Sequence, residues 1–137
     1  MRLTALPAAL LLIGLAGCSD QGSPVDPDDH PPPGSVPVSY AADVQPIWSA
    51  NCVGCHGAGG EGGLDLRASA GTAAIVSVTA TSYTGLRVVP GDPHSSVLYL
   101  KLEGDPRTGN RMPFGGALSA DELAIIHNWI AEGAANN

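Results

Sequence analysis

The sequence Cys52-Val53-Gly54-Cys55-His56 decides how this chain of 137 residues folds. Two thiols separated by two residues can reach the two vinyl groups on one edge of a porphyrin and form thioether bonds. The histidine that follows then places its imidazole against the iron as the proximal ligand. The spacing therefore predicts covalent attachment of one haem c through Cys52 and Cys55, with His56 as an iron ligand.

A pair of cysteines at this spacing has two other common uses. A disulfide or a thioredoxin-like redox pair would occur between a strand and a helix, and it gives no reason for His56 to follow. Structural zinc usually takes four protein ligands, whereas His30, His94 and His127 are scattered along the chain. Haem attachment gives a role to each of Cys52, Cys55 and His56, so we favour it.

The N-terminus has the pattern of a bacterial lipoprotein signal. Met1-Arg2 is followed by an apolar run from Leu3 to Ala16, which is too short for a bilayer-spanning helix of about 20 residues. Leu15-Ala16-Gly17-Cys18 resembles a lipobox, in which the cysteine is lipidated and becomes the new N-terminus. We expect a signal peptide at residues 1–17 and a lipid anchor on Cys18; ordinary signal cleavage, with Cys18 as a free thiol, is the alternative.

Residues 18–38 differ in composition from the rest of the chain. They hold six of its twelve prolines and almost no residue that could form a core, so we expect an extended tether. Residues 39–137 are enough for one domain. Loss of residues 1–17 would remove Arg2 and no acidic residue, leaving thirteen acidic and five basic residues and a charge of −8. This charge argues against nucleic acid as a partner and favours proteins with basic patches.

Helical patterns begin and end the expected domain. Val44, Ile47 and Trp48 share one face of a helix that we expect to start near Asp43 and to end at the cysteine motif. Near the C-terminus, Ser119 and Glu122 form a predicted capping box, flanked by Leu118 and Leu123 as a hydrophobic staple. The apolar residues of the helix that follows should pack against the first helix; they are Leu123, Ile126, Trp129 and Ile130.

The middle of the chain is less regular. We expect short helices at residues 68–76 and 95–102, the second after an N-cap at Asp92 and a first helical proline at Pro93. Because Leu98, Leu100 and Leu102 alternate, a strand is the alternative for the second segment. Residues 75–89 are rich in Val, Thr and Ser and could form short extended segments. Taken together, the patterns predict an all-α fold around one covalently bound haem.

Met112 is the candidate for the second axial iron ligand. It would be the one methionine left after the signal peptide is removed, and it lies in a polar loop rich in Gly and Pro where it has little to pack against. A thioether opposite His56 would favour ferrous iron and raise the reduction potential. His94 is the alternative ligand and would lower that potential. Arg67 and Arg111 are candidates to neutralise the haem propionates, or else simple surface arginines.

The order of these motifs resembles a class I monohaem cytochrome c domain. The resemblance covers residues 40–134 and rests on Cys52–His56, Met112-Pro113 and a C-terminal helix with an aromatic residue. Val89-Pro90-Gly91-Asp92-Pro93 and Trp129-Ile130-Ala131-Glu132-Gly133 are similar to a bacterial subgroup of exported cytochromes and planctomycete-type cytochrome domains. The resemblance implies a helical shell around the haem, His and Met axial ligands and electron transfer. It also implies a proline carbonyl bonded to the proximal imidazole, for which Pro90 is our candidate.

The sequence thus predicts a monomeric electron carrier rather than an enzyme. We expect it to be exported, lipid-anchored to a bacterial membrane and facing the periplasm or exterior, where it would exchange electrons with redox proteins. Two alternatives stay open. An open sixth iron site would suit a gas-binding or peroxidase-like protein, and a docked domain would suit a dedicated subunit of a larger oxidoreductase.

Overall fold

The structure, a computed structural model, describes residues 36–137. The expected signal peptide, the lipid-attachment residue Cys18 and most of the expected tether lie outside this range.

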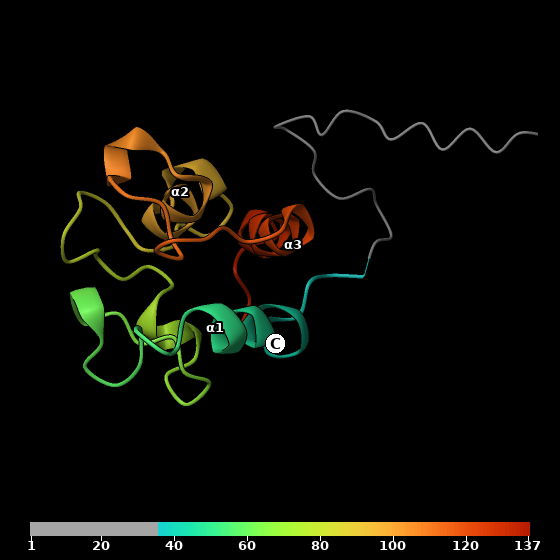
Figure 1. Cartoon of the computed structure of the whole chain (residues 1–137). Coiled ribbons are helices and arrows are strands. Elements are labelled where there is room, and N and C mark those ends of the chain that lie inside the picture. The colour runs from blue at the N-terminus through green and yellow to red at the C-terminus, as the bar shows by residue number, and fades with distance from the viewer. Residues whose placement is uncertain (1–35) are drawn as a thin grey trace, which may run out of the picture.

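Three short α-helices form the framework of the described chain: α1 (Gln45–Asn51), α2 (Val97–Glu103) and α3 (Ala120–Ala131). In Figure 1, α2 and α3 lie on one side of the molecule and α1 on the other, and the C-terminus ends beside the turn that precedes α1. Residues 36–137 contain no strand beyond isolated bridges, in agreement with the predicted all-α fold. None of the helices in this part of the chain has both the length and the hydrophobicity needed to span a bilayer.

The first helix begins three residues earlier than expected. Tyr40–Val44 form a π-helical turn, η1, that continues directly into α1. Pro46 has no backbone N–H and suits only the start of an α-helix. The wider turn before it is closed by the N–H of Gln45, which donates to the carbonyl of Tyr40. The predicted face of this helix is confirmed, since Val44, Ile47 and Trp48 are all buried.

The second helix is divided by Ser96. Asp92 caps a 3-10 turn, η4 (Pro93–Ser95), by accepting a hydrogen bond from the N–H of Ser95, as predicted. The α-helix starts only at Val97, because the Ser96 hydroxyl bonds the backbone of the preceding turn: it accepts from Val89 N at 2.8 Å and donates to Asp92 O at 2.8 Å. The segment predicted at 95–102 is therefore a 3-10 turn followed by α2.

The third helix has the predicted capping box at Ser119 and Glu122. Its apolar face packs on η1 and α2, and the ring centroids of Tyr40 and Trp129 lie 5.2 Å apart. The expected contact with the first helix is thus made mainly by its π-helical start, η1. A single side-chain bond, from Asn51 Nδ2 to Glu122 Oε1 at 3.2 Å, links the end of α1 to the start of α3.

Residues 57–92 are mostly irregular, with two short 3-10 turns, η2 (Glu61–Gly63) and η3 (Thr72–Ala74). The helix predicted at 68–76 is reduced to η3, because Gly71 adopts a positive φ of 60° at its start. The extended segments expected at 75–89 are present as isolated bridges, Val76 with Val88 and Thr79 with Leu86. Residues of this stretch form one wall of a cavity that α2 also lines.

Candidate functional site

A cavity of about 240 Å³ lies between α1, α2 and the irregular stretch. One part of its lining is apolar and comes from the core: Trp48, Leu64, Leu66, Ala80, Val97, Leu98 and Leu102. The rest is polar or charged: Glu61, Thr81, Ser82, Tyr83, Arg87 and Lys101. Cys52, His56 and Met112 also line it. Three of the four iron- and haem-binding residues predicted for the described chain therefore meet in one cavity.

The cysteine motif forms a tight turn at the end of α1. Cys52 caps the helix, and its carbonyl accepts hydrogen bonds from the N–H groups of Cys55 and His56, at 3.1 and 2.8 Å. Gly60 lies directly against this turn: a Cβ at that position would be 2.6 Å from the carbonyl oxygen of Cys55. The close approach explains why a glycine is needed there.

The two cysteines lie in different surroundings. Cys55 is exposed, whereas Cys52 is half-buried at the cavity. Burial, together with the negative charge of Glu122, raises the pKa of the Cys52 thiol to about 11. At neutral pH the free Cys52 side chain is therefore an uncharged thiol.

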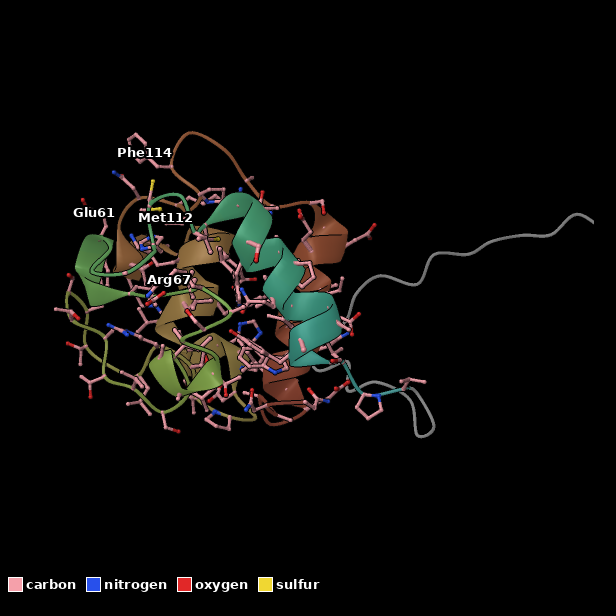
Figure 2. All side chains as sticks on the ribbon, turned by 90° about the horizontal axis from the view of Figure 1, so that it is seen from below. Glu61, Arg67, Met112 and Phe114 are labelled. Carbon is pink, nitrogen blue, oxygen red and sulfur yellow. The ribbon has the colours of Figure 1, made fainter. Side chains whose placement is uncertain are left out.

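The imidazole of His56 is held by the loop that follows the motif. Its Nδ1 lies 3.1 Å from the carbonyl oxygen of Glu61. A proton on Nδ1 leaves the lone pair of Nε2 for a metal. The prediction that the carbonyl of Pro90 bonds this nitrogen is wrong. Glu61 follows His56 by only five residues, and the glycines between them let the chain turn back towards the imidazole. Figure 2 shows Glu61 and Met112 at the same end of the molecule.

The alternative ligand, His94, does not line the cavity. Its ring lies 5.9 Å from that of Tyr99 and 5.8 Å from that of His127, and its Nδ1 is 3.9 Å from a carboxylate oxygen of Glu103. The geometry therefore favours Met112 over His94 as a second ligand. In residues 36–137 no three His, Cys, Asp or Glu side chains are grouped so that they could hold a metal ion.

The two arginines expected near the haem propionates have other partners. Arg67 forms a two-pronged ion pair with Asp65, with its Nη2 2.7 Å from Oδ2, and Arg111 Nε donates to Leu102 O at 2.8 Å. The cations that line the cavity are Arg87 and Lys101. Sequence reasoning gave neither residue a role at the site, although Lys101 begins a segment, Lys101-Leu102-Glu103-Gly104, that resembles the bacterial cytochrome subgroup. Only the folding of 57–92 over α2 brings the two cations together.

The cavity fits a flat ligand with an apolar body and an acidic edge. Its apolar lining would cover a porphyrin, and Arg87 would face a carboxylate. In addition, the indole N–H of Trp48, which lines the cavity, is buried without a hydrogen-bond partner among the described residues. A buried donor of this kind ordinarily has a partner, so the cavity wall offers a polar contact as well as apolar ones.

Comparison with known proteins supports this view of the site. Residues 41–134 match the family model described as cytochrome c. No curated protein and no solved structure gave a significant match.

Proposed function

The chain belongs to the cytochrome c family and carries a covalently attached haem c, and from this premise we propose that it is a membrane-tethered electron carrier whose iron is ligated by His56 and Met112. When bound, the haem iron supplies a one-electron redox couple. The observation that carries the ligand assignment is that Cys52, His56 and Met112 line one cavity while His94 lies outside it.

Each of these residues has a defined task in the proposal. Cys52 and Cys55 hold the porphyrin edge through thioethers, so that a small domain retains the group. His56 is oriented by Glu61 O and presents its other nitrogen. Met112 would supply a thioether ligand to the iron, which would exclude small ligands and let the iron change its charge with little rearrangement.

The polar rim supplies the contacts for the haem carboxylates. Arg87 is held by two carbonyls and a hydroxyl, since it donates to Ala74 O at 2.8 Å, to Gly63 O at 2.9 Å and to Thr81 Oγ1 at 3.3 Å. Among the described residues it forms no ion pair with a carboxylate. Its charge is therefore available to a propionate, and we assign it this role together with Tyr83.

The surface next to Met112 suits brief contacts with redox partners. Phe114, two residues after Met112, is 80% exposed and projects away from the ribbon in Figure 2. Small apolar contacts of this kind are typical of weak electron-transfer encounters. The acidic charge of the chain favours partners with basic surfaces, and the lipobox and the Pro-rich segment support anchoring on the outer side of a bacterial membrane.

The proposal is tested by absorption spectra of the full-length protein matured in a periplasm, oxidised and reduced, with and without carbon monoxide. We expect a far-red band from thioether-to-ferric-iron charge transfer and at most a very slow reaction with carbon monoxide. Met112→Ala should abolish the band and allow carbon monoxide to bind, because the sixth position opens. His94→Ala, the matched control, should leave both properties unchanged.

The other outcomes identify the competing functions. Ready binding of carbon monoxide by the unaltered protein would indicate a gas-binding or peroxidase-like site. A low-spin haem that is changed by His94→Ala, and not by Met112→Ala, would indicate two histidine ligands. Catalytic turnover of a substrate by the purified protein would contradict the role of simple carrier.

A further inference from the structure

Lys101 of α2 holds the loop that carries Met112 through both its backbone and its side chain. After Gly104 the chain reverses, and residues 105–112 run back along the helix. The backbone N–H of Met112 donates to Lys101 O at 2.9 Å. The side chain of Lys101 then holds the same loop a second time, since Nζ donates to Thr108 O at 2.8 Å and to Asn110 O at 2.9 Å.

The ammonium group of Lys101 is committed to these contacts. Among the described residues it has no carboxylate partner. Its remaining neighbour is the ring of Tyr83, whose centroid lies 4.8 Å from Nζ. Hydrogen bonds from an ammonium group to carbonyls are stronger than those between neutral groups, and here both carbonyls belong to the loop that presents Met112.

The loop itself satisfies the end of the helix. The last carbonyls of an α-helix have no partner within it, and in α2 those of Lys101 and Leu102 accept from Met112 N and from Arg111 Nε. Gly104 leaves room for this return, because a Cβ there would meet the Arg111 side chain at 3.3 Å. Thr108, one of the two residues whose carbonyl Lys101 holds, is itself buried.

We propose that Lys101 is the positioning residue for the sixth ligand: its ammonium group clamps residues 108–110 and thereby keeps the Met112 sulfur at the cavity. This inference rests on the proposed ligation by Met112. Removal of the clamp should free the loop while the domain stays folded, so the sulfur would leave the cavity more often.

The test uses the haem-loaded full-length protein with Lys101→Leu, which keeps an apolar stem and adds no ligand. We expect the far-red band to disappear at a lower guanidinium concentration than the helical circular dichroism signal, and carbon monoxide to bind about tenfold faster than to the unaltered protein. Lys101→Arg, which keeps the charge and donors, should restore most of the band. Arg107→Leu is the control, because Arg107 lies in the same loop but bonds only to Asp105.

A double variant distinguishes positioning from a direct effect on the haem. In the Met112→Ala background, Lys101→Leu should change carbon monoxide binding less than twofold, because the residue acts through Met112. An equal acceleration in both backgrounds would overturn the proposal and make Lys101 a propionate partner. Loss of the band only together with global unfolding would also overturn it. Absence of the band from the unaltered protein would instead refute Met112 ligation, and the role of Lys101 with it.

Discussion

At the scale of single residues, the cysteine motif depends on a glycine outside it. Gly60 has an ordinary negative φ, but a Cβ there would be 2.6 Å from Cys55 O and 2.8 Å from the Cα of His56. We expect Gly60→Ala to destabilise the haem-loaded protein by about 1–3 kcal/mol, the usual cost of overpacking, and to lower the yield of matured protein. Guanidinium unfolding and haem staining measure the two effects.

Gly54 provides the matched control within the motif itself. A Cβ at Gly54 would meet nothing within 4 Å, and this glycine has no positive φ. Gly54→Ala should therefore change stability by less than about 0.5 kcal/mol. Equal effects of the two substitutions would show that close packing against the turn is not what requires a glycine at position 60.

At the scale of elements, α3 is fixed at its N-terminus by Ser119 and Glu122. The Glu122 carboxylate accepts hydrogen bonds from the backbone N–H and the hydroxyl of Ser119 and from the side-chain amide of Asn51. These bonds lower the pKa of Glu122 below its ordinary 4.5. A lowered pKa stabilises the fold above pH 4.5, and this contribution is lost as the pH falls through the folded-state pKa. We expect Glu122→Gln to lower the free energy of unfolding at pH 7 but not well below pH 4.5, and Ser119→Ala to cost about 1 kcal/mol at pH 7.

Asp121→Asn controls for the interaction of an acidic side chain with the dipole of α3, as distinct from its hydrogen bonds. Asp121 lies in the same first turn and has no side-chain hydrogen bond among the described residues, so its substitution should cost less than that of Glu122. The measurement is guanidinium unfolding of each variant at the two pH values, followed by circular dichroism. A pH-independent effect of Glu122→Gln would contradict the assigned cause.

At the scale of the whole molecule, the two ends of the described chain meet. Ala41 N donates to Asn137 O at 2.9 Å, Tyr40 N to Asn137 Oδ1 at 2.8 Å, and Val38 N to Glu132 Oε2 at 2.8 Å. The segment that leads into the domain is thus bound beside α3, and the cavity lies on other elements. A tether entering here would leave the cavity rim accessible, as a carrier requires.

The tether itself is tested by cell fractionation. We expect the haem protein to sediment with membranes and Cys18→Ser to shift most of it to the soluble or unprocessed fraction, since two or more acyl chains are needed for durable anchoring. The Cys18→Ser protein that is released should keep the unaltered absorption spectrum. Equal membrane association of both proteins would refute lipidation of Cys18.

The sequence alone determined the cofactor, the fold class and the helices at both ends of the domain. These follow from local rules: the spacing of Cys52, Cys55 and His56, the 3.6-residue period of Val44, Ile47 and Trp48, and the capping pattern at Ser119. The N-cap at Asp92 was predictable for the same reason. Each of these signals is complete within a few neighbouring residues.

Only the tertiary structure decided how the cavity is closed. The position of His94 outside the cavity, the cations Arg87 and Lys101, and the π-helical turn that receives Trp129 all depend on contacts between distant segments. Residues 57–92 have almost no regular secondary structure, so no periodicity reveals which side chains they present to α2. A local pattern can state which groups a chain carries, but the packing of irregular segments determines which of those groups meet.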